Sequence, residues 1–465
     1  MINWDTSSFL TNVTHVDGRN APKLMILKPI FSEFGFMKIR LEVMIKYVLH
    51  VSKKIGKLNL STSDKDHMLK IYTDLTIDHA KRVKKYEKVV NHDLKALELF
   101  FISSLKRSHL FRLIPYVNLG IGSEDINTIA IAMQLNKSRG EVLLPLFKEI
   151  VFSLTKLANS EKDITMIART HGQPANITTF GKEVASTLLR LCDEIEIFQH
   201  SALDAKCSGE VGSFQAQFAV NPIVDWIAIT DSFIRSFGLH PNHGATQITP
   251  YDSMVRYLQS VQRINTILLD FAKNMWLYVL LGYLKVKKIS SEVGSAGMPH
   301  KVNPIYFEGA EGGFIMANGI IETLARTLMI NRLDRDFSDS TIRRNMVMPI
   351  ALSVLSYQSI IEALKRIAID HDAMKKDIEK HQEVWIETIK VYAITHGIPD
   401  AYEILKKKTR GMVMTVQDLV DLIEIFPLTK NQKKECLSFC GKQVNPYPTK
   451  IVEEALRKAK KLMSL

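Results

Sequence analysis

One stretch in the second half of the sequence, residues 290–304, gathers polar groups that can take part in chemistry. It reads SSEVGSAGMPHKVNP, and Ser295, His300, Lys301 and Asn303 fall within nine residues. Its glycines and prolines prevent a continuous helix, because glycine adds backbone freedom and proline lacks an amide donor. We predict a loop that closes over a substrate and carries a catalytic residue with it.

A second reactive position is His171, in the sequence ARTHGQPA of residues 168–175. A histidine followed by Gly-Gln-Pro cannot sit in the middle of a helix, so we predict that a turn presents it beside Arg169 and Thr170. A single histidine is usually structural, whereas one presented on a turn suits acid-base work. From the residues alone, both interpretations stay open.

Residues 331–345, NRLDRDFSDSTIRRN, combine four arginines with three hydroxyl side chains. Arginine forks beside hydroxyls, such as Arg335, Ser340 and Arg344, recognise phosphate or carboxylate groups through paired hydrogen bonds. The alternative is a solvated run of charges, balanced by the aspartates of the same segment.

Three shorter polar motifs interrupt apolar segments. VDGR at 16–19 predicts a turn in which glycine supplies a positive φ. NHD at 91–93 predicts a helix cap, although its histidine also suits anion binding. GSEDIN at 122–127 predicts a helix start, with Ser123 as cap and two acidic residues favoured by the helix dipole.

The segments between these motifs predict helices. Apolar residues recur every three or four positions in residues 33–51, 141–159, 182–201 and 254–285, and helical segments are also expected at 316–329 and 347–368. The 254–285 segment lacks proline, so we predict one helix of about 48 Å. Strand-like alternation is scarce, and such long apolar helices favour an all-α bundle that is shared between subunits.

The composition predicts three consecutive domains: a mostly helical one at 1–112, a central bundle of long helices at 113–364, and a small helical one at 365–465. In the last block charged and apolar residues interleave. Short surface helices are predicted there at 402–408 and 416–426.

The overall composition excludes a disordered chain, because 46% of the 465 residues are hydrophobic. Residues 1–20 lack the pattern of a signal peptide, and the longest uncharged run, 345–361, is too short and too polar for a membrane span. The four cysteines indicate a reducing compartment, and no metal site is expected. The net charge of +12 fits lysine-rich surfaces or attraction of small anions; no alternation of basic and aromatic residues indicates nucleic-acid binding.

The loop sequence GSAGMPHKVNP resembles the GSSxMPxKxNP signature of the fumarase/aspartase superfamily. RTHGQPA, together with VDGR, NHD, SEDIN and DRDFSDSTIRRN in the same order, resembles the adenylosuccinate lyase family within it. The resemblance covers residues 15–365 and also matches a three-domain superfamily plan whose long helices form a multi-subunit core. The C-terminal block, residues 365–465, resembles the C-terminal domain of the family in its general helical composition and contains no motif of the family.

The resemblance implies roles for residues of this chain. Ser295 is expected to be the general base on the mobile loop and His171 the general acid, while Lys301 and Asn303 hold the carboxylate that takes up charge. The positions expected to bind substrate are Arg19, Asn20, Asn91, His92, Asp93, Gly122, Ser123, Thr170, Gln247, Arg335, Ser340 and Arg344.

The resemblance further implies a cytoplasmic lyase of purine nucleotide biosynthesis that removes fumarate from adenylosuccinate and from SAICAR. It implies no metal or organic cofactor, no nucleic-acid or membrane partner, and a homotetramer with shared active sites. The alternatives are another lyase of the superfamily, such as argininosuccinate lyase, a non-catalytic helical scaffold, and a basic nucleic-acid-binding bundle. The arginine and hydroxyl cluster argues against the first, and Ser295, His171 and Lys301 argue against the second.

Five positions depart from the residues usual in the family: Asn20, Gly122, Ala296, Gly297 and Gly309. The two in the signature loop, Ala296 and Gly297, predict a looser lid than in relatives.

Overall fold

The computed structural model describes residues 7–291, 297–441 and 445–464. Its contacts divide the chain into two compact units, which are mostly helical, as the all-α prediction requires. Unit 1 comprises Met1–Leu146, Ile197–Thr266 and Gly313–Ser356, and unit 2 comprises Phe147–Glu196, Ile267–Gly312 and Tyr357–Leu465. This is a different division from the three consecutive blocks 1–112, 113–364 and 365–465, which stay a prediction.

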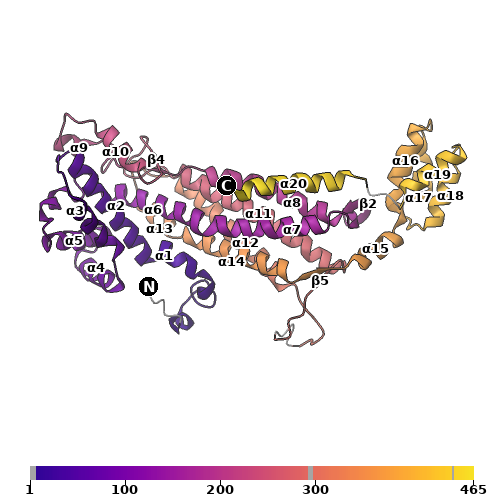
Figure 1. Cartoon of the computed structure of the whole chain (residues 1–465), viewed down its shortest axis with the longest axis horizontal. Coiled ribbons are helices and arrows are strands. Elements are labelled where there is room, and N and C mark those ends of the chain that lie inside the picture. The colour runs from indigo at the N-terminus through magenta and orange to yellow at the C-terminus, as the bar shows by residue number, and fades with distance from the viewer. Residues whose placement is uncertain (1–6, 292–296, 442–444, 465) are drawn as a thin grey trace. The chain divides into compact units, whose positions relative to one another are not determined.

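The described residues of unit 1 form mainly helices, which Figure 1 shows, and short helical turns. Unit 1 also includes the parallel pair of two-residue strands β3 and β4. Its elements are η1 (Ser7–Thr11), η2 (Ala21–Leu27), α1 (Lys28–Phe31), α2 (Glu33–Lys54), α3 (Thr62–Thr73), α4 (Ile77–Val90), α5 (Asp93–Lys106), η3 (Phe111–Tyr116), α6 (Ser123–Ser138), the π-helical turn η4 (Arg139–Leu143), β3 (Asp204–Ala205), α9 (Gln215–Val220), α10 (Trp226–Arg235), β4 (His240–Pro241) and α13 (Ser338–Arg343). The helices with residues in both units are α7 (Leu144–Ser160), α8 (Phe180–His200), α11 (Asp252–Leu280), α12 (Ile305–Leu328) and α14 (Val347–Lys365).

Two helices form the centre of unit 1. α2 packs against α6, and Leu41, Val43 and Ile45 of α2 are fully buried. α6 is buried on nearly all sides from Glu124 to Leu135, as expected for a helix that runs through a core. The N-terminus of α6, which carries Ser123, therefore has a fixed position.

The NHD motif ends one helix and begins the next. Asn91 terminates α4 in the left-handed conformation, with φ 50°, which asparagine tolerates well. His92 is the cap of α5, because its side chain accepts a hydrogen bond from the backbone N–H of Lys95. The prediction of a cap is confirmed, with histidine as the capping residue.

Unit 2 contains short strands and a group of small helices. Its remaining elements are β1 (Thr165–Thr170), β2 (Gln173–Thr179), β5 (Leu284–Val286), β6 (Ile367–Ile369), α15 (His371–Lys380), η5 (Gln382–Trp385), α16 (Ile386–Thr395), α17 (Ala401–Thr409), α18 (Val416–Glu424), α19 (Lys430–Phe439) and α20 (Tyr447–Ser464). β1 pairs with β2 and β5 with β6, both antiparallel. Figure 1 shows α16 to α19 gathered into one group, whose core includes Trp385, Ile389 and Leu419.

The prediction of one helix over residues 254–285 is wrong at its C-terminal end. α11 stops at Leu280, and Gly282 follows with φ 75°. The N–H groups of Gly282 and Tyr283 donate to the carbonyls of Val279 and Tyr278, and the rings of Tyr278 and Tyr283 stack. These two hydrogen bonds form a Schellman motif, which ends a helix at a left-handed glycine. The contact between the two tyrosine rings is the apolar contact that usually accompanies this motif. The chain can then form β5.

One stretch of the described residues, Ser338–Lys365, is long and apolar enough by composition to cross a membrane. Within its most apolar window, 61% of the residues are buried in the structure. A core helix of a globular protein passes the same test, so this finding is weak evidence for a membrane span.

Candidate active site

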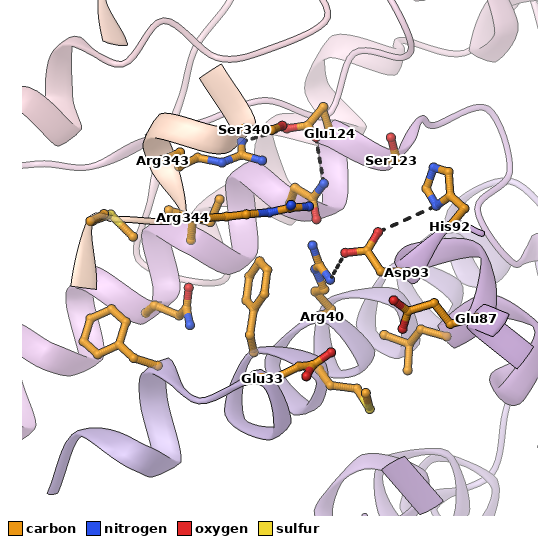
Figure 2. Close-up of a pocket in the computed structure, with 18 of the residues that line it drawn as sticks. Glu33, Arg40, Glu87, His92, Asp93, Ser123, Glu124, Ser340, Arg343 and Arg344 are labelled. Atoms are coloured by element: carbon orange, nitrogen blue, oxygen red, sulfur yellow. Dashed lines mark hydrogen bonds and ion pairs between the residues drawn. The ribbon is translucent and has the colours of Figure 1, made fainter. Parts of the chain in front are cut away.

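A cavity of about 610 Å³ lies within unit 1 and is lined by residues of α2, α4, α5, α6 and α13. Figure 2 shows polar side chains of these elements facing one another across it. Seven of the predicted substrate-binding residues line this cavity: Asn91, His92, Asp93, Ser123, Arg335, Ser340 and Arg344. Three motifs far apart in the sequence therefore meet at one place.

A buried carboxylate, Glu124, organises the arginines of this cavity. Its side chain is 4% exposed, and its two oxygens lie 2.9 Å from Arg343 Nη1 and 3.2 Å from Arg335 Nη2. Burial opposes ionisation of Glu124, but the charges and hydrogen bonds of Arg343 and Arg335 outweigh it and lower its pKa. Arg335 Nη2 also donates to Ser340 Oγ at 2.8 Å. The network fixes the direction of the Arg335 guanidinium.

Arg344 differs from its neighbours. It is exposed, it lines the cavity, and within the described part of the chain it makes no ion pair. Figure 2 shows its side chain among those that line the cavity. A guanidinium without a carboxylate partner can bind a phosphate or carboxylate of a ligand with two parallel hydrogen bonds.

A second ion pair borders the cavity on the side of α2 and α5 (Figure 2). Arg40 Nη1 donates to Asp93 Oδ2 at 2.8 Å. Burial opposes ionisation of Asp93, but Arg40 outweighs it and lowers the pKa of this carboxyl. The His92 Nδ1 accepts the Lys95 amide, so the neutral His92 ring carries its proton on Nε2 and can donate it to a ligand.

Sequence reasoning missed the buried pair Asp125 and Lys206. The side chain of Lys206 is 1% exposed, and its Nζ lies 3.2 Å from Asp125 Oδ1. Asp125 accepts from the backbone N–H groups of Gly122 and Gly209, and Lys206 donates to the carbonyls of Gly209 and Thr246. The pair thus ties the start of α6 to two loops. No local signal separates Lys206 from the many surface lysines.

Two further predicted residues of unit 1, Gln247 and Gly122, lie outside the lining of the cavity. Gln247 Oε1 accepts from Arg335 Nη1 at 3.4 Å, and its amide donates to Glu210. Gly122, rather than Ser123, is the N-cap of α6, and its N–H donates to Asp125. Gln247 therefore contacts a residue that lines the cavity, whereas Gly122 contacts Asp125, which is not among the lining residues.

Arg19 is the last residue of VDGR and Asn20 follows it; neither residue lines the cavity. The prediction that Gly18 supplies a positive φ there is wrong. Glycine is required because a Cβ atom would lie 2.7 Å from the carbonyl oxygen of Thr14.

His171 and Thr170 lie in unit 2, on the β1–β2 hairpin. Thr170 pairs with Gln173, and His171 and Gly172 form the two-residue loop with φ 54° and 78°. Positive φ at both central residues is what a type I′ hairpin turn requires. The predicted turn is confirmed, although a β-hairpin, and no helix, carries it. Both Thr170 and His171 are exposed.

Lys301 and Asn303 also belong to unit 2, in the irregular segment between β5 and α12. Lys301 is exposed, and its N–H donates to the Met298 carbonyl at 3.1 Å. Ser295 and Ala296 lie outside the described residues, so the roles predicted there stay predictions.

The described residues contain no group of three or more His, Cys, Asp or Glu side chains that could hold a metal ion. All four cysteines are free. Burial raises the pKa of Cys436 to about 11, which is typical of an unreactive thiol.

Comparisons with known proteins agree with the motifs. The family model described as Lyase matches residues 19–318, and the model described as Adenylosuccinate lyase C-terminal matches residues 331–443. The chain is 34% identical to an adenylosuccinate lyase of Legionella pneumophila (strain Corby), over 96% of this chain and 99% of the relative. It is 33% identical to that of Escherichia coli (strain K12), over 92% and 94%.

Two solved structures share the fold at low sequence identity. A fumarate lyase from Mesorhizobium sp. BNC1 superposes with a TM-score of 0.74 at 15% identity, over 93% of this chain and 97% of that one. A 3-carboxy-cis,cis-muconate lactonizing enzyme from Pseudomonas putida gives 0.73 at 16%, over 94% and 97%. The family models, the identity to these relatives along nearly their whole length and the shared fold agree: this chain belongs to the adenylosuccinate lyase family of the fumarase/aspartase superfamily.

Proposed function

We propose that this enzyme releases fumarate from adenylosuccinate, giving AMP, and from SAICAR, giving AICAR. The observation that carries the proposal is the cavity of unit 1, which is lined by Arg335, Ser340 and Arg344 and also by His92. Such a set of cations and hydroxyls suits a substrate with one phosphate and two carboxylates. A lyase for a substrate without phosphate, such as argininosuccinate lyase, would have less use for the whole set.

The proposed reaction is a β-elimination. Ser295 takes a proton from the succinyl Cβ, the electron pair forms the C=C bond of fumarate, the C–N bond breaks, and His171 protonates the departing nitrogen. A serine hydroxyl is a weak base, so loop closure must remove water from it and supply donors that favour the alkoxide. Lys301 and Asn303 stabilise the carboxylate that takes up charge. This scheme uses neither a metal ion nor an organic cofactor.

We further propose a cytoplasmic homotetramer with shared active sites. Large apolar side chains are exposed near the end of α11, at Leu277 and Leu280, and on α12, at Ile315 and Met316. Exposed apolar groups of this kind favour subunit contacts. In the proposed assembly, different subunits supply the binding groups and the reacting groups. When His171→Ala and Arg344→Met proteins are mixed and their subunits exchange, the mixture should then show more activity than the sum of the two separate proteins, measured at a substrate concentration well below the KM of Arg344→Met protein; active sites built from single subunits would give only the sum.

Ultraviolet absorbance tests the proposed activity directly. The purified protein is mixed separately with adenylosuccinate, SAICAR, argininosuccinate and malate, with Ser295→Ala protein as the matched control. We expect turnover of the first two substrates only. Absence of adenylosuccinate cleavage, or faster cleavage of argininosuccinate, would contradict the proposal.

A further inference from the structure

A cluster of three polar side chains in unit 2 has no assigned role in the reaction. Arg169 of β1 donates from Nη1 to the Tyr283 hydroxyl at 2.9 Å and from Nη2 to Asp377 Oδ2 at 2.6 Å. The Tyr283 hydroxyl donates to the same carboxylate oxygen. Asp377 lies on α15, so the cluster joins three segments that are far apart in the sequence.

The Asp377 carboxylate is the centre of this cluster. Burial opposes its ionisation, but the hydrogen bonds from Tyr283 and Arg169 outweigh this effect and lower its pKa. The side chains of Arg169 and Asp377 are 18% and 20% exposed, and His381 Nε2 lies 3.7 Å from Asp377 Oδ1. A part-buried, charge-assisted set of bonds holds its geometry better than an exposed ion pair.

Each partner of Asp377 leads to a segment that carries a proposed reacting group. Arg169 stands two residues before His171, at the end of β1. Tyr283, fixed by the Schellman motif at the end of α11, directly precedes β5. In the sequence, β5 is followed by residues 287–304, which include Ser295 and Lys301.

The hairpin also packs against the C-terminal part of the chain. β1 lies against α15 and β2 against η5. Ile167 of β1 is buried in the same apolar cluster as Trp385 and Ile389. The apolar cluster thus fixes the hairpin at Ile167. The polar cluster fixes it at Arg169, close to the exposed turn.

We propose that Asp377 is a positioning residue for His171 and acts through Arg169, while the Asp377 carboxylate also accepts the hydrogen bond of Tyr283. The inference rests on the proposed function, in which His171 is the general acid. If the inference is correct, α15 contributes to the reaction through Asp377 without contacting the substrate.

The test compares Asp377→Asn with Glu379→Gln, an exposed carboxylate on the same helix. Asparagine keeps the volume of Asp377 but removes its charge. Since a displacement of about 1 Å can cost about a hundredfold in rate, we expect kcat for adenylosuccinate to fall about tenfold to a hundredfold, with KM changed less than about threefold. Tyr283→Phe, which keeps the buried ring, should show a smaller loss of the same kind, and Glu379→Gln none.

A double-mutant cycle separates positioning from general damage. If Asp377 acts by placing His171, Asp377→Asn should lower the residual kcat of His171→Ala protein by less than about twofold, because no imidazole remains to be placed. An equal loss in both backgrounds, or no loss in the wild-type background, would overturn the proposal. If Asp377→Asn fails to fold, Tyr283→Phe completes the same cycle. A wild-type protein without activity, or a fully active His171→Ala protein, would instead refute the proposed function.

Discussion

The cavity of unit 1 and the His171 turn of unit 2 differ in how their polar side chains are held. In the cavity, Glu124 and Arg343 are buried and paired, so their directions are fixed before any ligand arrives. On the turn and in the loop, His171 and Lys301 are exposed. Groups that recognise a charged substrate bind it better when they are already ordered, because less conformational freedom is lost on binding. Groups that transfer protons must instead be accessible to the reacting atoms of the substrate, and exposed turns and loops on a rigid scaffold provide this access.

The comparison predicts that changes on the turn affect rate and changes in the cavity affect binding and stability. The largest effect is expected at the turn. His171→Ala should lower kcat by about 10²-fold to 10⁴-fold, the usual contribution of a general acid, with little change in KM. Steady-state kinetics with adenylosuccinate measure it. His200→Ala, at an exposed histidine of α8, serves as control, and an equal loss in both variants would refute the assignment.

In the cavity, Glu124→Gln should destabilise the fold. It removes the charge between Arg335 and Arg343 and leaves them with Asp339, whose oxygens lie 3.4 Å from Arg335 Nε and 3.9 Å from Arg343 Nη1. Loss of one partner from a buried ion pair costs up to about 3–5 kcal/mol. The free energy of unfolding in urea measures the loss. Glu141→Gln removes an exposed carboxylate 3.9 Å from Lys137 and should cost less than about 1 kcal/mol. If both variants lost the same free energy of unfolding, the burial of Glu124 would make no contribution to stability.

Arg344→Met should weaken substrate binding without harming the fold. The loss of charge-assisted hydrogen bonds, about 1.5–3 kcal/mol, predicts an increase in KM of about tenfold to a hundredfold. Arg332→Met is the matched control, since Arg332 belongs to the same motif but does not line the cavity. An unchanged KM in Arg344→Met protein would exclude Arg344 from the binding site.

The smallest effect concerns pH. Because the pKa of Glu124 is lower in the folded protein than in the unfolded chain, its ion pairs stabilise the fold above about pH 4.3. This contribution is lost as the pH falls through the lowered pKa. Urea unfolding at several pH values between about 7 and about 3 should show a steeper acid loss in wild-type protein than in Glu124→Gln protein. If stability falls with pH equally in both proteins, carboxyl groups other than Glu124 cause the loss of stability in acid.

The motifs, the helical class and the family could be predicted from the sequence, since each depends on local pattern. The pairing of Glu124 with Arg343 could not, because 219 residues separate them and only the fold brings them together. The buried state of Lys206 and the contacts of Asp377 depend on tertiary packing in the same way. The end of α11 is hard to predict because a long helix can tolerate a single glycine, whereas Gly282 adopts the left-handed conformation that ends one.

The central claim is that the cavity residues bind the substrate while the residue on the turn takes part in the reaction. It is tested most directly by calorimetric titration of adenylosuccinate into three proteins: His171→Ala, Ser295→Ala, and Arg344→Met combined with Ser295→Ala. His171→Ala protein should bind with a Kd within about threefold of that of Ser295→Ala protein, and Arg344→Met should bind at least about tenfold more weakly when placed in the Ser295→Ala background. If His171→Ala abolishes binding while Arg344→Met leaves it unchanged, the division of labour between the two regions is wrong.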